Sequence, residues 1–464
     1  MVSRNGINVI IFALAGISFG SASCVADTLL QAMTKAYNHS GLLEQNRAVL
    51  RAADEDVASA VATLRPVISW SAGIESNYNK SLTSGVSDTE STAGSLTLSA
   101  EMTIYDGGAN KYAIEAAKET VLATRESLIS IEQNVLLDVV QAYMDVRRET
   151  ETVALRQNNL RVIKEELRAA QDRFDVGEVT KTDVALAEAR YASSLAQLEL
   201  AKGDLRQSKA RYRQAVGMPA DDLSAPPNLP NLPNSAETAR SIALQNHPDM
   251  RQIQHIIKAA ELNIARSKTA SGPTAKISGS LGLNRDDRST TTNRRSISVT
   301  IGGPIYSGGN IPSIIRKAQA QKDSQVANLH VRKHQIEQNT ATSYALLEMA
   351  RASRKATEEQ IRASQVAFDG MKEEVALGAR TTLDVLNAEQ DLLNAKANLI
   401  SALADEQIAA YRLLAQMGQL TVDRLNLPVQ KYDPAAYYEH VKNAPSESAQ
   451  GKALDRVLKA LGQD

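Results

Sequence analysis

The sequence is short of cysteine and of aromatic residues, and both shortages restrict what the chain can be. Its 464 residues include one cysteine, Cys24, so an internal disulfide and a cysteine-based metal cluster are excluded. Phe, Trp and Tyr together make up 4% of the chain. Compact cores usually rely on aromatic rings for buried area, so this composition favours long helices that pack through small and aliphatic side chains.

An excess of charge of one sign and the common catalytic motifs are also missing. Basic residues number 52 and acidic residues 53, a balance that argues against bulk electrostatic binding of nucleic acid. The chain has no Gly-rich phosphate loop and no Gly-x-Ser-x-Gly elbow. His330 and His334 are spaced for a metal, but Val331-Arg332-Lys333 between them supplies positive charge and no carboxylate. We therefore predict no enzyme, no metal site and no cofactor.

Residues 1–26 have the organisation of a secretory signal peptide. A basic residue precedes an apolar run at 7–19, and small residues follow it up to Ala26, after which we predict cleavage. The run is too short to cross a bilayer as a helix, and no later segment approaches about 18 uninterrupted apolar residues. An alternative makes Cys24 a lipidated first residue, but Ser21 occupies the position where a lipoprotein signal has Leu.

The rest of the chain is predicted to contain two copies of one unit. Tyr105-Asp106-Gly107-Gly108 recurs 201 residues later as Tyr306-Ser307-Gly308-Gly309. Asp183-Val184 recurs at the same offset as Asp384-Val385. Each copy reads as a helix, two strands and two long helices. Two copies of this unit explain the length of the chain better than three domains do.

Proline and glycine set the boundaries of the two repeats. Long windows without proline permit very long helices, and short Gly-containing turns join these helices as antiparallel hairpins. We predict β-hairpins at about 67–104 and 276–305, and long helical hairpins at 109–217 and 310–418. The predicted segments are a signal peptide at 1–26, a first repeat at 27–217, a Pro-rich linker at 218–235, a second repeat at 236–427 and a C-terminal tail at 428–464.

The predicted strands alternate apolar and polar residues. In the first strand, Ile68 and Trp70 face one way while Ser69 faces the other, and the connections around 83–92 and 285–295 are polar. Strands of about 9 to 11 residues match a tilted crossing of an outer membrane, with the apolar face on lipid and the polar face on a lumen. Four strands cannot close a barrel. Several chains must therefore contribute, and three chains would supply twelve strands.

These features resemble the TolC family of outer-membrane efflux and type I secretion channels. The resemblance extends from Asp27 to about Leu427, and the duplication of its motifs makes it specific. The motifs that carry it are Arg173-Phe174-Asp175-Val176-Gly177, Thr182-Asp183-Val184, Leu377-Gly378, Arg380-Thr381, Asp384-Val385-Leu386 and Pro304-Ile305-Tyr306-Ser307-Gly308-Gly309. The resemblance implies a mixed fold, in which a transmembrane β-barrel is continued by a long α-helical barrel. Each chain would supply four strands, and the barrel would close only as a homotrimer.

The resemblance also implies a location and partners. The barrel would lie in the outer-membrane lipid of a Gram-negative cell, and the tunnel would project into the periplasm. The channel would be the passive exit duct of tripartite efflux and type I secretion systems, working with a periplasmic adaptor and an inner-membrane ABC, RND or MFS transporter. One alternative is a dedicated drug-efflux factor not used for secretion. Another is a periplasmic adaptor or structural coiled coil, which would lack duplicated membrane-type strands.

Residues at the helix tips receive roles from the same resemblance. Arg380 would hold Thr182 and Asp183 and so keep the tunnel shut, while Val375 replaces a family Tyr that also contacts the Asp. The adaptor would dock on the tips themselves. The predicted docking residues are Val176, Gly177, Glu178, Leu377, Gly378 and Ala379, of which Glu178 and Ala379 depart from the usual Leu and Thr.

A polar stripe begins in the second repeat at the same tip. By resemblance, Asp384 matches an acidic ring at the tunnel entrance, and Asn387 stands where the family has a second acid. Polar residues recur from there at helical spacing without a base: Asp384, Asn387, Asp391, Asn394, Asn398, Ser401 and Asp405. The pattern alone favours a solvated helix face, whereas the resemblance implies a lumen lining that attracts cations.

Overall fold

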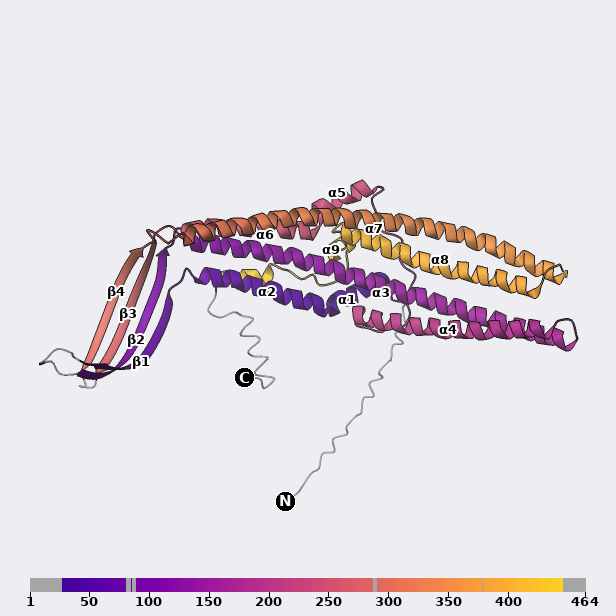
Figure 1. The fold of residues 1–464 in the computed structure, drawn as a ribbon, viewed down its shortest axis with the longest axis horizontal. Coiled ribbons are helices and arrows are strands. Elements are labelled where there is room, and N and C mark those ends of the chain that lie inside the picture. Colours follow the sequence, from indigo (N-terminus) through magenta and orange to yellow (C-terminus); the bar gives the residue numbers. More distant parts are fainter. Residues whose placement is uncertain (1–26, 81–84, 86–88, 287–289, 378, 445–464) are drawn as a thin grey trace, which may run out of the picture.

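The computed structural model describes residues 27–80, 85, 89–286, 290–377 and 379–444. In this part of the chain, two hairpins of very long helices run from a four-stranded sheet at one end to two helical tips at the other (Figure 1). The predicted signal peptide with Cys24, the tip residue Gly378 and the tail beyond residue 444 lie outside the described residues.

The elements of the second half repeat those of the first. The first half contains α1 (Leu29–His39), α2 (Gly41–Ala62), β1 (Val67–Asn79), β2 (Thr89–Tyr105), α3 (Ala109–Asp175) and α4 (Lys181–Val216). The second half contains α5 (Ala236–Asn246), α6 (Pro248–Thr269), β3 (Thr274–Asp286), β4 (Thr291–Gly302), α7 (Asn310–Ala376) and α8 (Thr382–Gln416). Two short helices follow, α9 (Val422–Leu425) and α10 (Ala436–Val441). α3 and α7 have 67 residues each. The first residue of α7 lies 201 positions after that of α3, and the same offset separates their last residues.

Glycine fixes where the two long helices begin. Gly108 and Gly309 precede them with φ angles of +90° and +82°, in the left-handed region that favours glycine. At about 1.5 Å per residue, 67 residues span roughly 100 Å. Pro312 lies in the first turn of α7, where its missing N–H costs no intrahelical hydrogen bond. No helix in the described ranges combines the length and apolar character needed to cross a membrane.

The helices pack through small side chains, as the composition predicts. Four buried residues of α4 share a seven-residue spacing: Ala187, Ser194, Ala201 and Ser208. Two of the few aromatic residues, Tyr143 and Tyr212, are fully buried near the middle of the bundle, with ring centroids 6.4 Å apart. The Tyr143 hydroxyl lies 2.9 Å from the Asp27 carbonyl oxygen and 2.7 Å from that of Ser224, so it joins the start of the described chain to the linker.

The four strands form one antiparallel sheet in the order β1-β2-β3-β4. They have 13, 17, 13 and 12 residues, so the predicted length of about 9 to 11 is too short. β2 begins at Thr89 and β4 at Thr291, inside segments predicted to be loops. The hydrogen bonds between strands join backbone groups, so strand pairing can continue through polar residues. Polar side chains therefore do not end a strand where both faces of the sheet meet water. Every residue of the two edge strands is exposed, and the sheet is not closed within one chain.

We expect the close approach at Gly418, which follows α8, to make this position intolerant of a side chain. Its φ is +70°, and an added Cβ would lie 2.7 Å from the Asn246 carbonyl oxygen. Gly418→Ala should therefore destabilise each chain by more than about 1 kcal/mol, measured as a lower temperature of thermal dissociation of the purified assembly. Gly203→Ala is the control, because an added Cβ there meets nothing within 4 Å and helix propensity favours alanine. Equal melting of Gly418→Ala and wild type would contradict the expectation.

Candidate functional site

The two helical tips lie together at the end of the molecule farthest from the sheet (Figure 1). At the first tip, Glu178 donates its backbone N–H to the Arg173 carbonyl oxygen at 2.9 Å, and Gly177 has a φ of +82°. Two apolar side chains project from the tips into solvent, Val176 with 71% exposure and Leu377 with 85%. All the described residues of the predicted docking set are exposed, and their role as a docking surface stays a prediction.

Both tips continue into a helix through the same capping box. Asp183 accepts hydrogen bonds from the backbone N–H and the hydroxyl of Thr180 at 2.8 and 2.7 Å. In the second repeat, Asp384 accepts from the N–H and hydroxyl of Thr381 at 3.0 and 2.8 Å. These hydrogen bonds lower the pKa of both carboxyl groups, so each stays ionised at the positive end of its helix. The two acids of the predicted gate and ring therefore also fix where α4 and α8 begin.

Within one protomer, Arg380 forms an ion pair at the second tip. Its Nε lies 3.0 Å from Oε2 of Glu374, and both side chains are about half exposed. Among the described residues of a single protomer, Arg380 forms no hydrogen bond or ion pair with Thr182 or Asp183. The predicted link from Arg380 to Thr182 and Asp183 therefore stays a prediction for the assembled channel. Sequence reasoning did not identify Glu374, because only the fold of the tip brings it back to Arg380.

A hydrogen bond that the sequence did not predict joins the two hairpins near the tips. Nη2 of Arg190 on α4 donates to Oδ1 of Asn387 on α8 at 2.8 Å. Asn387 is the residue that stands in place of the second acid. An amide oxygen here accepts a hydrogen bond without adding a negative charge, and the bond ties the first hairpin to the second within one protomer.

A buried carboxyl group on α8 lies deeper between the hairpins, near a second carboxyl group that is only partly buried. Glu389 on α8 is 9% exposed, and its Oε2 has no hydrogen-bond partner among the described residues. Burial, and then the charge of Glu166 on α3, raise the pKa of Glu389 to about 7, while Lys372 on α7 opposes the shift. Glu188, the counterpart of Glu389 in the first repeat, is exposed. The difference arises because α8 packs against both α7 and α3, whereas α4 lies at an open edge of the protomer.

The polar stripe on α8 is at least partly exposed along its whole length. Near its far end, Asp405 lies 3.5 Å from Nη1 of Arg148 on α3, so one stripe acid faces a base of the other repeat. The exposure fits both a solvated outer face and a lumen lining, because both are wet. The assignment of Asp384 and Asn387 to a pore ring stays a prediction.

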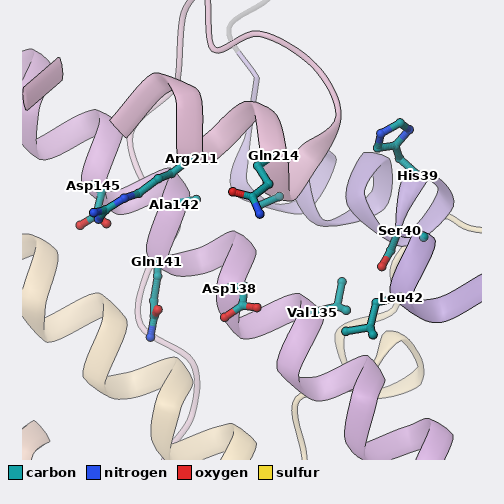
Figure 2. A pocket seen from close by; sticks show the side chains of 12 residues that line it. His39, Ser40, Leu42, Val135, Asp138, Gln141, Ala142, Asp145, Arg211 and Gln214 are labelled. Carbon is teal, nitrogen blue, oxygen red and sulfur yellow. The ribbon is translucent and has the colours of Figure 1, made fainter. Parts of the chain in front are cut away.

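The middle of the bundle contains a groove of 460 Å³ where the α1–α2 junction meets α3 and α4 (Figure 2). His39, Asp138 and Arg211 are among the side chains that line it. Burial raises the pKa of Asp138. The groove lies far from the tips, because its α4 residues are at the end of that helix opposite the tip. The described residues contain no group of three His, Cys, Asp or Glu that could hold a metal ion.

The chain is similar in sequence to outer-membrane proteins of transport systems. A family model described as Outer membrane efflux protein matches residues 33–218 and 239–419. The outer membrane efflux protein BepC of Brucella suis is 35% identical over 437 residues, covering 93% of this chain and 94% of BepC. The alkaline protease secretion protein AprF of Pseudomonas aeruginosa is 24% identical over 342 residues, covering 71% of each chain.

The fold is also found in solved structures. The CmeC outer membrane channel of Campylobacter jejuni matches with a TM-score of 0.75 and 16% sequence identity. The match covers 95% of this chain and 98% of that chain. The identity is low, so this likeness concerns the arrangement of the helices and strands alone.

The raised pKa of Glu389 predicts a pH dependence of stability. A carboxyl group with a raised pKa in the folded state stabilises the fold below its ordinary pKa, and this contribution is lost as pH rises through about 7. We expect thermal unfolding to occur at lower temperature as pH rises from about 5 to about 8. Glu389→Gln should make this dependence shallower and raise the unfolding temperature at the higher pH, while Asp54, whose pKa burial raises to about 6, keeps its own contribution. Glu188→Gln, at the exposed counterpart, should change neither; an unchanged pH profile in Glu389→Gln would contradict the assignment.

Proposed function

The chain belongs to the outer membrane efflux protein family, and from this premise we propose that it is the shared exit duct of tripartite efflux and type I secretion systems. The resemblance and the fold class predicted from the sequence are confirmed: the protein is a TolC-type channel of the Gram-negative outer membrane and not an enzyme. Both an efflux protein and a protease secretion protein are among its relatives, which supports a shared duct over a dedicated drug-efflux factor.

One observation carries the proposal: a single chain holds an unclosed membrane-type sheet at one end and unclosed helical hairpins at the other. Among the described residues, no further strand pairs with the outer edge of β1 or of β4, and α4 packs mainly along α3. Three copies, each with four strands, would form a twelve-stranded barrel. The helices α3, α4, α7 and α8 of each copy would then form a twelve-helix periplasmic tunnel below it.

The tips are the proposed site of both docking and gating. A periplasmic adaptor would cover the exposed apolar side chains of Val176 and Leu377, and an inner-membrane ABC, RND or MFS transporter would supply the energy. Polar contacts at the same level would hold the tunnel closed. Arg380 would supply the contact to Thr182 and Asp183 between neighbouring hairpins, and the bond from Arg190 to Asn387 supports the closed position within each protomer.

We expect Arg380→Ser to open the tunnel. The substitution removes a charged donor whose hydrogen bonds are worth about 1.5 to 3 kcal/mol each, so single-channel conductance in planar bilayers should rise. Arg362→Ser is the control, because Arg362 lies on α7, before the tip, and pairs with Glu359 on the same helix. Equal conductance of Arg380→Ser and wild type would contradict the gating role.

We expect Asp384→Asn to weaken cation selectivity. Asparagine keeps an oxygen for the capping box with Thr381 but removes the charge that three copies would concentrate around the axis. Reversal potentials in a salt gradient should move toward zero, and block by divalent cations should weaken. Asp204→Asn, which removes an exposed acid from α4 far from the tip, should leave selectivity unaltered. Wild-type selectivity in Asp384→Asn would contradict the pore-ring assignment.

A further inference from the structure

Two arginines lie on the apolar face of the sheet. On β4, Arg295 shares a face with Ile297 and Val299, while Ser296 and Ser298 lie on the opposite face, where their hydroxyls contact serines of β3 at 2.7 and 2.8 Å. On β3, Arg285 shares the apolar face with Leu281 and Leu283. Because the apolar face of an outer-membrane sheet meets lipid, these two positions place positive charge against the membrane.

Both arginines lie toward the outer end of the sheet. The helices mark the periplasmic end, so the β1–β2 and β3–β4 connections mark the outer end (Figure 1). Arg285 is one residue from the end of β3, and Arg295 is four residues beyond the start of β4, about 13 Å along the strand. A long arginine side chain can extend its guanidinium outward from such a position to the headgroups of the outer leaflet.

A hollow in the apolar face lies beside each arginine. The first, of 640 Å³, has Ala100 and Gly279 paired at its floor and Arg295 at its edge. Its apolar walls are Ile68, Leu98, Leu281 and Ile297. The second, of 650 Å³, lies around Gly94, which pairs with Arg285. Small residues thus leave room beside each charge for an apolar chain.

The described residues provide neither arginine with an ion-pair partner. On the opposite face of the sheet, Glu101 pairs with Lys276 at 2.7 Å. Asp286 lies on that face too, and its side chain accepts a hydrogen bond from the Thr290 N–H. An uncompensated guanidinium facing lipid is costly, so an anion from the membrane itself would stabilise it.

We propose that Arg295 and Arg285 bind the phosphate groups of lipid A, the phosphorylated glycolipid of the outer leaflet, with an acyl chain in the hollow over Ala100 and Gly279. Guanidinium groups donate paired hydrogen bonds to phosphate, which suits two phosphates on one lipid better than a single headgroup. The position near the outer end of the sheet selects an outer-leaflet lipid. This binding is separate from transport through the tunnel.

The test uses the full-length trimer in phosphatidylcholine nanodiscs, titrated with lipid A. Trp70, the single tryptophan of the chain, lies on the apolar face in the same row as Leu98, Leu281 and Arg295, so its fluorescence reports binding there. Arg295→Gln should weaken lipid A binding about tenfold, the loss expected for one charged hydrogen bond. Arg294→Gln is the matched control, because the neighbouring side chain lies on the opposite face and should bind as wild type does.

Further variants and other lipids test the two parts of the proposed site, the hollow and the phosphate contact. Ala100→Leu, which fills the hollow without touching an arginine, should also weaken binding. Equal lipid A affinity of Arg295→Gln and Arg294→Gln would overturn the proposal, and so would equal binding of dephosphorylated lipid A or of phosphatidylglycerol. Conductance of Arg295→Gln and Ala100→Leu, both on the lipid-facing side, should stay at the wild-type value, so loss of lipid binding is distinguished from failure of the channel.

Discussion

Backbone groups of a membrane sheet cannot remain unpaired in hydrocarbon, and the rest of this structure depends on that constraint. β1 and β4 each present an outer row of N–H and C=O groups with which no other strand of the described ranges pairs. Each unpaired group in lipid costs several kcal/mol, and a folded domain has only about 5 to 15 kcal/mol in total. Copies must therefore join edge to edge. Since α3 and α7 follow directly from β2 and β4, the union of the sheets also arranges the long helices around one axis.

Duplication has placed equivalent residues in different surroundings. α8 packs along both α7 and α3, whereas α4 packs mainly along α3 within one protomer. The packed face of α8 consequently contains a buried acid, Glu406. Its carboxylate forms ion pairs with Arg354 and Arg351 of α7, at 2.7 and 3.6 Å. Both arginines are partly exposed, and removing them would leave the buried Glu406 carboxylate without a counter-charge, so the α7–α8 hairpin is held together by charge as well as by alanine.

The sequence predicted what depends on local spacing and missed what depends on contacts between helices. Proline-free windows and the repeated glycines located α3 and α7, because helix ends are set by nearby residues. The pairs Arg190 with Asn387 and Arg380 with Glu374 were missed, because the rotation of one helix against another and the fold of a tip decide them. The strands are longer than predicted. The alternating apolar pattern marks only the part of each strand that would face lipid, whereas backbone pairing continues beyond it.

The equal length of α3 and α7 restricts how such a chain can change over time. Deleting one residue from α3 would draw its tip back by about 1.5 Å and turn it by about 100°, which would move the capping box at Thr180 out of level with that at Thr381. Insertions or deletions of about seven residues, or a multiple of seven, would preserve the seven-residue spacing of the buried small side chains. Made together in α3, α4, α7 and α8, they would also keep the two tips level with each other. The length of the proposed tunnel can therefore change only in steps of roughly 10 Å, the rise of seven helical residues.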